Sequence, residues 1–484
     1  MGKKSLLKNY FFNATYSLLS VIIPIITIPY ISRILLANGV GQVSYAQNIV
    51  SYFVLVASLG IPSYGIREVA KKAADIEQRS NVFWEIFSIN LLSTAVATIT
   101  YYVSIGLFAC FQERKTLLAV VGISLILNAF NIDWFYKGIE EFQYITIRSY
   151  IIKIVSLFAI FIFVRTADDV LCYAFISTTS VSANYLLNIV HVRKYIHKPR
   201  IKELKLSRHL KSIFFMFATA LAVDLYTQLD TTMVGAICGE TYVGYYTNAM
   251  KLTKIVIIVI TAIGTVLLPR LSAYYAEHRI AEMSSLASKA VEYILFIALP
   301  CSLGLFIISD DVVKVLFGVD FLPAIPTLQI LALLIPIISV GNIFGSQLLI
   351  TLNLEKLMTV TVVIGATVNI SLNSVLIKQF QQNGAAIASV IAEFCVLVAQ
   401  ICLTRKSVRV KVNPENLCKT ILQCVAMAAT IFGVRWFSIT GVIRLLLEVV
   451  MGGTVYFAIG FLCNNRLLIE LFGKVKVRMV SRKR

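Results

Sequence analysis

The stretch AIPTLQILALLIPIISVGNIFGSQLLI (residues 324–350) contains no charged side chain. A helix of about 20 apolar residues is long enough to cross the hydrocarbon core of a bilayer, which is about 30 Å thick. Similar runs recur along the chain, in which 58% of residues are hydrophobic and 14% are charged, against about 25% charged in a globular protein. The sequence therefore predicts an all-α, polytopic integral membrane protein.

Fourteen apolar runs can be placed as transmembrane helices. They lie at residues 11–32, 43–64, 83–109, 116–135, 149–165, 169–191, 212–238, 242–267, 288–309, 324–350, 357–379, 384–403, 417–435 and 441–463. The longest predicted external connection is the short loop around residues 310–323. No connection is long enough for an external catalytic domain.

The net charge of +19 comes from 44 Lys and Arg against 25 Asp and Glu. These basic residues lie between the apolar runs, most densely in residues 192–211 and 464–484, and do not alternate with aromatic residues. If both termini are cytoplasmic, about 33 of the 44 fall on the cytoplasmic side, as the positive-inside rule requires. The charge thus predicts orientation in the membrane and no nucleic-acid partner.

The cysteines and histidines do not form a recognisable ligand set. Nine cysteines are scattered singly without a CxxC pair, and the four histidines all lie in predicted cytoplasmic connections. Small apolar core residues explain such cysteines. We expect no metal and no cofactor.

A weak internal repeat relates the two halves of the chain. The segment GQVSYA (41–46) aligns with GYYTNA (244–249), and Arg67 aligns with Arg270 at the end of the same helices. Two units in the same orientation are related by an axis along the membrane normal. We therefore predict two six-helix lobes related by a pseudo-two-fold axis. The predicted domains are an N-lobe at residues 1–205, a C-lobe at 206–405, and helices 13 and 14 with a basic tail at 406–484.

Charged residues inside predicted spans are candidates for function, because burying a charge in hydrocarbon is costly. Lys251 and Lys254 lie three residues apart on one face of the eighth span, near the bilayer centre. Asn48 and Ser51 occupy the equivalent positions of the second span. This pattern favours a cavity between the lobes, although long lysine side chains can also extend to the membrane surface.

Two acidic residues, Asp224 and Asp230, lie in the seventh span. Either carboxylate could pair with Lys251 or Lys254, or carry a coupling proton. The alternative is a structural ion pair, in which a buried charge is matched because an unmatched one is not tolerated.

Arg33 and Glu393 are two further candidates with open alternatives. Arg33 follows Pro29 and Tyr30 at the outer end of the first span, where it could serve as an interfacial anchor. Glu393 lies midway along the twelfth span and could contact substrate or pack against asparagines of the eleventh span.

The stretch NIDWFYKGIEEFQY (131–144) places Trp134, Phe135 and Tyr136 where the fourth span ends. Their position predicts an aromatic belt at the lipid headgroups. The stretch also resembles the signature of the polysaccharide (Wzx-type) flippases, a branch of the multidrug/oligosaccharidyl-lipid/polysaccharide exporter superfamily. Further resemblances follow in family order: PYISRILLANGVGQVSYAQNIVSYF (29–53), GIREVAKK (65–72), LDTTMVG (229–235), VGYYTNAMKL (243–252), LLPRLS (267–272), LFGVDF (316–321) and GAAIASVIAEF (384–394).

The resemblance implies a transporter, not an enzyme, in the bacterial cytoplasmic (inner) membrane. Its implied substrate is an undecaprenyl-diphosphate-linked oligosaccharide repeat unit, which moves to the outer leaflet by alternating access during O-antigen, capsule or exopolysaccharide synthesis. A polysaccharide polymerase and chain-length machinery are the implied protein partners. The diphosphate is anionic, so Lys251, Lys254 and Arg33 are the candidate binding residues, together with Asn48 and Glu393.

Three other functions can be compared with the flippase hypothesis. A multidrug exporter of the same fold needs an acidic cavity for its cationic substrates, which the two lysines argue against. A polysaccharide polymerase or ligase needs a sizeable external loop, which this chain lacks. A teichoic-acid precursor flippase has the same requirements as the leading hypothesis and is not separated from it by the sequence.

Overall fold

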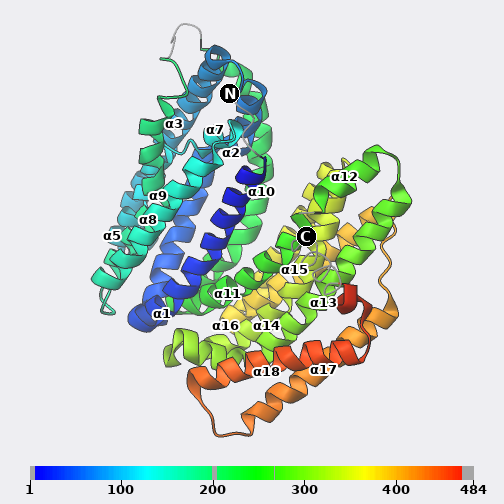
Figure 1. Cartoon of the computed structure of the whole chain (residues 1–484). Helices are drawn as coiled ribbons and strands as arrows, with labels where there is room; N and C mark the ends of the chain where they lie inside the picture. Colours follow the sequence, from blue (N-terminus) through cyan, green and yellow to red (C-terminus); the bar gives the residue numbers. More distant parts are fainter. Residues whose placement is uncertain (1–5, 199–203, 266, 471–484) are drawn as a thin grey trace. The chain divides into compact units, whose positions relative to one another are not determined.

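The computed structural model describes residues 6–198, 204–265 and 267–470 (Figure 1). Within these ranges every regular element is a helix, which confirms the prediction of an all-α protein. The chain divides into two compact units, Met1–Gly235 and Ala236–Arg484. The boundary falls at the end of the predicted seventh helix rather than before it. The predicted lobes and their pseudo-two-fold relation stay a prediction.

The first unit is built around a long kinked helix, α1, against which α3, α8 and α9 pack (Figure 1). Its helices are α1 (Leu6–Ser58), α2 (Ile61–Lys71), α3 (Ile76–Leu107), α4 (Ala109–Gln112), α5 (Lys115–Val121), α6 (Ile123–Asn128), α7 (Asp133–Gly138), α8 (Phe142–Phe163), α9 (Val170–Val192) and α10 (Ser207–Cys238). The last three residues of α10 belong to the second unit.

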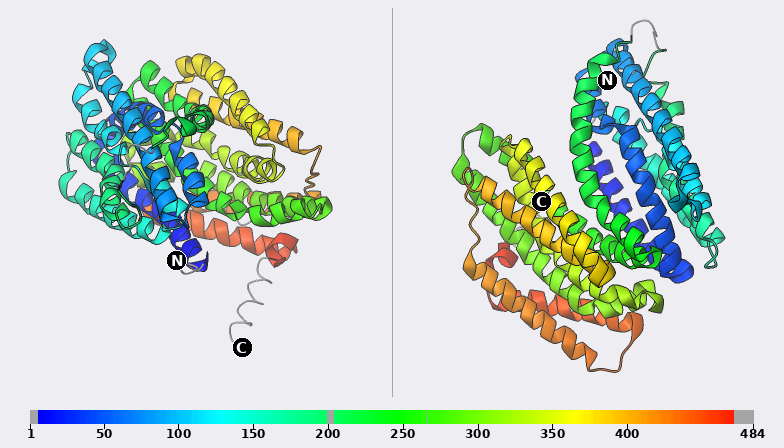
Figure 2. Two further views of the ribbon diagram at one scale, coloured as in Figure 1. Left: turned by 90° about the horizontal axis from the view of Figure 1, so that it is seen from above. Right: turned by 180° about the vertical axis from the view of Figure 1, so that it is seen from behind.

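In the second unit, α17 and α18 form an antiparallel hairpin that packs on α13 (Figure 2). Its helices are α11 (Glu240–Thr265), α12 (Leu268–Ala276), α13 (Ile280–Val312), η2 (Val313–Phe317), η3 (Val319–Ala324), α14 (Ile325–Ala332), α15 (Leu334–Asn342), η4 (Ile343–Leu349), α16 (Glu355–Thr404), α17 (Pro414–Arg435) and α18 (Gly441–Leu462).

Eleven helical segments of the described chain are long and apolar enough to cross a membrane, or up to twelve if the bent α10 is one span. Two of them, Ile22–Lys71 and Glu355–Thr404, contain 50 residues each. At 1.5 Å per residue, a straight helix of this length would be about 75 Å long, more than twice the thickness of the hydrocarbon core. Glu355–Thr404 contains two predicted spans, and Ile22–Lys71 contains one and the second half of another. The chain is a multi-pass membrane protein, and the count of fourteen stays a prediction.

The two long helices each contain one residue with non-helical backbone angles. Leu36 in α1 has φ 59° and ψ −177°, and Gln381 in α16 has φ 54° and ψ −132°. Positive φ is unfavourable for residues with a side chain beyond Cβ, so the surrounding packing must hold these kinks. Both kinks lie between the two predicted spans that each helix contains.

The prediction of an aromatic belt at residues 134–136 is wrong. Trp134, Phe135 and Tyr136 are 2%, 0% and 0% exposed, and they pack in a buried cluster with residues of α2 and α3. Gly65 of α2 permits this packing, because a Cβ there would lie 2.4 Å from Cε3 of Trp134. The aromatic side chains therefore form the core of the first unit near the start of α8.

The segment 310–323, predicted to be an external loop, is mostly helical. Helix α13 extends to Val312, and the π-helical turn η2 and the 3₁₀ helix η3 follow it almost without interruption. Phe317 and Phe321 are 1% and 0% exposed. Buried aromatic residues anchor this segment, so it is a packed part of the second unit.

Candidate functional site

The two predicted substrate lysines lie together near the middle of α11. Tyr246, Ala249 and Thr253 recur at helical spacing and are buried within the second unit. The hydroxyl of Tyr246 is 3.1 Å from Oγ of Ser389 in α16, which ties the two helices together. Lys251 and Lys254 are exposed. The packing of α11 thus leaves two ammonium groups, one helical turn apart, on an accessible surface of the second unit.

Glu393 is the third candidate in the second unit. It lies in α16, four residues after Ser389, and is half-buried. Four residues correspond to about one turn of helix. Glu393 therefore follows the contact between α11 and α16 by one turn.

The remaining candidates belong to the first unit. Arg33 is exposed and precedes the kink of α1 at Leu36 by three residues. Asp230 is 6% exposed in α10. The predicted site residues are thus distributed over both units, and the predicted pairing of Asp230 with a lysine stays a prediction.

Asn48 is buried at the contact between α1 and α10. Its Nδ2 donates hydrogen bonds to Oε1 of Gln228 at 2.7 Å and to the backbone oxygen of Gln228 at 3.2 Å. Its Oδ1 accepts a hydrogen bond of 2.6 Å from Oγ1 of Thr232. The hydroxyl of Tyr52 lies 2.7 Å from the same Oγ1. Because Thr232 gives its only proton to Asn48, Tyr52 must be the donor to Thr232.

These hydrogen bonds form a continuous series in which each side chain donates to the next, from Tyr52 through Thr232 and Asn48 to Gln228. Hydrogen bonds in such chains polarise one another and fix the orientation of each side chain. At the end of this series the oxygen of the Gln228 amide accepts a hydrogen bond, so its NH₂ group remains as the last donor.

A cavity of about 320 Å³ with a mixed polar and apolar lining lies beside these hydrogen-bonded side chains, within the first unit. Three elements enclose it: α1, α2 and α10. Its lining includes Asp224 and Gln228 of α10, together with Ser51, Ser58 and Ser63. Asp224, predicted as a coupling or ion-pair residue, thus meets Gln228 and three serines at this cavity.

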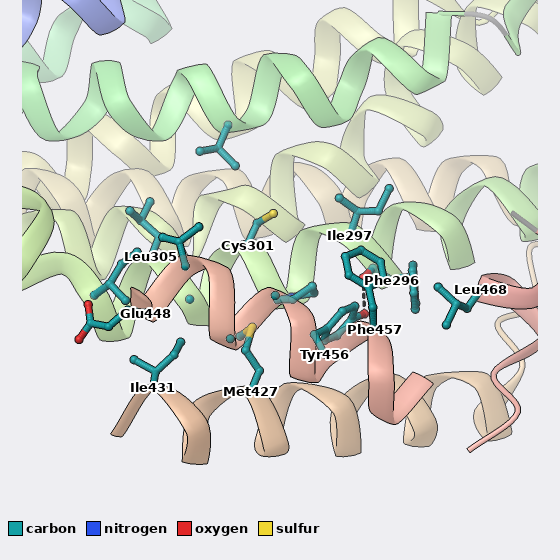
Figure 3. A pocket seen from close by; sticks show the side chains of 17 residues that line it. Phe296, Ile297, Cys301, Leu305, Met427, Ile431, Glu448, Tyr456, Phe457 and Leu468 are labelled. Carbon is teal, nitrogen blue, oxygen red and sulfur yellow. Dashed lines mark hydrogen bonds between the residues drawn. The ribbon is translucent and has the colours of Figure 1, made fainter. Parts of the chain in front are cut away.

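The second unit contains a different cavity, of about 650 Å³, between α13 and the α17–α18 hairpin (Figure 3). Its lining is almost entirely apolar. It includes Phe296, Cys301 and Leu305 of α13, Met427 and Ile431 of α17, and Tyr456 and Phe457 of α18. Such a cavity suits an aliphatic chain and offers little to a polar head group.

An ion network closes one end of the α17–α18 hairpin. Arg435 at the end of α17 donates from Nε to Oε1 of Glu448 at 2.9 Å and from Nη2 to Oδ2 of Asp311 at 3.3 Å. Arg444 of α18 donates from Nε to Oδ1 of Asp311 at 2.8 Å. Asp311 and Glu448 are 2% and 0% exposed. The network holds the hairpin against α13.

Sequence analysis missed Gln228, Thr232 and the ion network. Gln228 and Thr232 are spaced by one helical turn from each other and from Asp224, and this polar stripe was the available signal. In the ion network, Arg444 and Glu448 lie four residues apart in one predicted span, but their pairing with Asp311 and Arg435 joins three separate helices and is not visible in the sequence.

The described residues contain no group of three or more His, Cys, Asp and Glu side chains that could hold a metal ion.

Comparison with known proteins gives a consistent picture. A protein of Escherichia coli (strain K12), provisionally named as an O-antigen transporter, is 24% identical over 84% of this chain and 98% of its own length. The teichuronic acid biosynthesis protein TuaB of Bacillus subtilis (strain 168) is 23% identical over 59% of each chain. These names agree with the expectation that the chain is not an enzyme.

Among solved structures, the lipid II flippase MurJ in an inward closed conformation matches with a TM-score of 0.77 at 15% identity. The match covers 95% of this chain and 100% of that one. At this identity the likeness concerns the fold, which is MurJ-like. The model of one family, described as polysaccharide biosynthesis protein, matches residues 6–275, more than half of the chain. The chain belongs to this family of polysaccharide biosynthesis proteins.

Proposed function

We propose that the chain is a flippase that moves undecaprenyl-diphosphate-linked oligosaccharide repeat units from the cytoplasmic to the outer leaflet of a bacterial inner membrane. The repeat units would supply O-antigen, capsule or exopolysaccharide synthesis. The observation that carries the proposal is the match to an O-antigen transporter over 98% of that protein's length. A relative matched over its whole length is a stronger guide to function than a shared fold.

The exposed pair Lys251 and Lys254 supports an anionic substrate. Two ammonium groups one turn apart can each donate charge-assisted hydrogen bonds to a diphosphate. A cationic drug would be repelled by the same pair, which argues against a multidrug exporter. We propose that Lys251 and Lys254 bind the diphosphate and that Arg33 and Glu393 contribute to substrate binding. Asn48 is buried and bonded to Gln228 and Thr232, so we propose that it contributes by orienting the Gln228 amide.

The apolar cavity supports a lipid-linked substrate. Its apolar lining matches the chemistry of a polyprenyl chain. In this proposal the lipid chain contacts the α17–α18 hairpin and α13, within the same unit that contains Lys251 and Lys254.

A precursor of a teichoic acid is the alternative substrate. The sequence does not separate this alternative from an oligosaccharide repeat unit. Both substrates would combine an anionic diphosphate with a polyprenyl lipid, so the residues proposed above serve either one.

Deleting the gene tests the proposal and separates the two substrates. We expect a lipid-linked oligosaccharide to accumulate on the cytoplasmic face and surface polysaccharide to be lost. Accumulation of a lipid-linked polyol-phosphate precursor would instead identify the teichoic-acid alternative. If no lipid-linked intermediate accumulates and surface polymers are normal, the proposed function is wrong.

The lysine assignment has its own test. The double variant Lys251→Ala, Lys254→Ala should abolish export at normal protein levels, because both charges that would hold the diphosphate are lost. Exchanging both lysines for arginine should keep partial activity, since the charges remain. Full surface polysaccharide from the alanine variant would refute the lysine assignment and leave the flippase proposal standing.

A further inference from the structure

The 320 Å³ cavity of the first unit is lined by the carboxylate of Asp224, which has no hydrogen-bond partner among the described residues. Asp224 lies near the middle of α10, where the helix bends by 51° between Ala222 and Tyr226. Among the described residues, no side chain or backbone group donates to its carboxylate. A charged group inside a membrane span is costly unless something in a cavity compensates it. The Asp224 carboxylate can therefore accept a hydrogen bond from a ligand in the cavity.

The Gln228 amide provides a hydrogen-bond donor of fixed orientation beside Asp224. The oxygen of the Gln228 amide accepts from Asn48 at 2.7 Å, which directs the amide so that its NH₂ group remains for another partner. Within the described part of the chain, that NH₂ group donates to no residue. Asp224 and Gln228 line the same cavity. A ligand that both donates and accepts would satisfy both.

The other lining residues supply weaker hydroxyl groups and apolar surface. Ser58 accepts a hydrogen bond of 3.2 Å from Asn128, so its own proton can be donated elsewhere. Ser51 and Ser63 add two more hydroxyls, while Leu55 and Pro62 provide apolar contacts. The cavity thus mixes polar and apolar surface.

The wall of the cavity is held in place by Gly60, which connects α1 to α2. Gly60 has a φ of 73°, and a Cβ there would lie 2.7 Å from the backbone nitrogen of Phe217. The close approach brings α10 against the junction of α1 and α2. The close contact at Gly60 thus sets how α2 and α10 meet beside the cavity.

We propose that this cavity binds one sugar ring of the lipid-linked oligosaccharide, an inference that rests on the proposed function. Neighbouring hydroxyls of a sugar can act as donor and acceptor: one donates to the Asp224 carboxylate and the next accepts from the Gln228 amide. The apolar C–H surface of the ring packs on Leu55 and Pro62. The site belongs to the first unit, whereas Lys251 and Lys254, which would bind the diphosphate, belong to the second.

The volume and the lining of the cavity favour a sugar over a bare divalent cation. Small-molecule sites have volumes of about 300 to 1,000 Å³, and this cavity of 320 Å³ is at the lower end. A bare divalent cation requires six or more oxygen ligands at about 2.0 to 2.6 Å from one point. One carboxylate and a few hydroxyls around a space of this size do not meet that requirement.

The test compares two lipids on the full chain in lipid nanodiscs: undecaprenyl diphosphate, and the same lipid with one sugar (glucose, galactose or N-acetylglucosamine). Wild-type protein should bind at least one sugar-bearing lipid about tenfold more tightly than the bare lipid. Asp224→Ala and Gln228→Leu should reduce this preference to about twofold or less, with unchanged affinity for the bare lipid.

Two further variants separate hydrogen bonding from structure. Asp224→Asn should retain part of the preference, because its amide oxygen still accepts a hydrogen bond. Thr227→Ala is the matched control on the same helix: Thr227 is exposed and its hydroxyl donates only to the backbone oxygen of Asp224. This control should behave as wild type. Lys251→Ala with Lys254→Ala should weaken both lipids equally and leave the preference intact.

The outcomes distinguish the two proposals. If wild-type protein binds neither lipid, the flippase proposal and the sugar site both fail. If it binds both lipids equally, or if Asp224→Ala and Gln228→Leu keep the preference, the sugar site alone is overturned. Unchanged lipid binding with equal loss of transport in Asp224→Ala and Asp224→Asn would point to proton coupling and likewise overturn the sugar site.

Discussion

Nδ2 of Asn48 in α1 lies 2.7 Å from Oε1 of Gln228 in α10, although the two residues are 180 positions apart in the sequence. This hydrogen bond joins two helices of the first unit and also sets which end of the Gln228 amide is available as a donor. Packing and the proposed recognition of a sugar thus depend on the same contact.

A double-mutant cycle measures the strength of that contact. Asn48→Ala, Gln228→Ala and the double variant should give a coupling energy of about 0.6 kcal/mol, and at most about 1.7 kcal/mol, as for other hydrogen bonds between membrane helices. The measurement is reversible unfolding of purified protein in mixed micelles. The cycle of Asn48→Ala with Thr430→Ala, whose hydroxyl bonds only within α17, is the control and should show additivity. Additivity of the first pair would contradict the contact.

The ion network at Asp311 should contribute strongly to the stability of the second unit. Asp311→Ala leaves Arg435 and Arg444 without one of their partners, and removing one member of a buried charge pair costs about 3 to 5 kcal/mol. Both arginines are about one-quarter exposed, at 27% and 20%, so we expect the lower end of that range. Hydrogen exchange should become faster in α17 and α18.

A nearby surface pair provides the matched control for Asp311. Lys314 lies 2.8 Å from Asp310 and both side chains are exposed by more than a third. Lys314→Ala should change stability by about 0.5 kcal/mol or less, because exposed helix pairs contribute little. Equal destabilisation by the two variants would show that the buried network has no special role.

Gly65 should be intolerant of even one added methyl group. A Cβ at Gly65 would lie 2.4 Å from the ring of Trp134, so Gly65→Ala must displace a fully buried aromatic side chain. Overpacking of this kind costs about 1 to 3 kcal/mol. Thermal unfolding in detergent measures the effect. At Gly433 in α17 a Cβ would meet no atom within 4 Å, so Gly433→Ala should be neutral or stabilising. A neutral Gly65→Ala would contradict the packing of Trp134.

The helical, membrane-spanning nature of the chain could be predicted from composition, because an apolar helix satisfies its own backbone hydrogen bonds in lipid. The spacing of Lys251 and Lys254 likewise predicted a shared face, since it depends only on helix geometry. The location of Trp134 could not be predicted. An aromatic residue at the end of an apolar run is equally suited to the headgroup layer and to a core, and a glycine about 70 positions earlier decided the outcome.

The role of Gln228 could not be read from the sequence for a related reason. The orientation of its amide depends on Asn48, in a helix that comes much earlier in the chain. Asp224 could be identified as unusual because a charge inside a span is visible in the sequence. Its relation to the serines of α1 and α2 requires the packing of three helices around one cavity.

The predicted orientation places both termini in the cytoplasm, because the basic connections then lie on that side. A phosphatase reporter that is active only in the periplasm, fused after Arg484, should give no activity. The same reporter inserted after Trp436, in the connection between α17 and α18, should be active. The reverse pattern would overturn the orientation.

Direct measurement of lipid movement tests the central proposal most sharply. Purified protein is reconstituted into liposomes that contain a glycosylated undecaprenyl diphosphate, and the sugar exposed to an external glycosidase is followed over time. With wild-type protein, sugar that starts in the inner leaflet should become accessible. The Lys251→Ala, Lys254→Ala protein should behave as protein-free liposomes do. If wild-type protein exposes no more sugar than protein-free liposomes under an imposed ion gradient or membrane potential, the chain is not a flippase for this class of lipid.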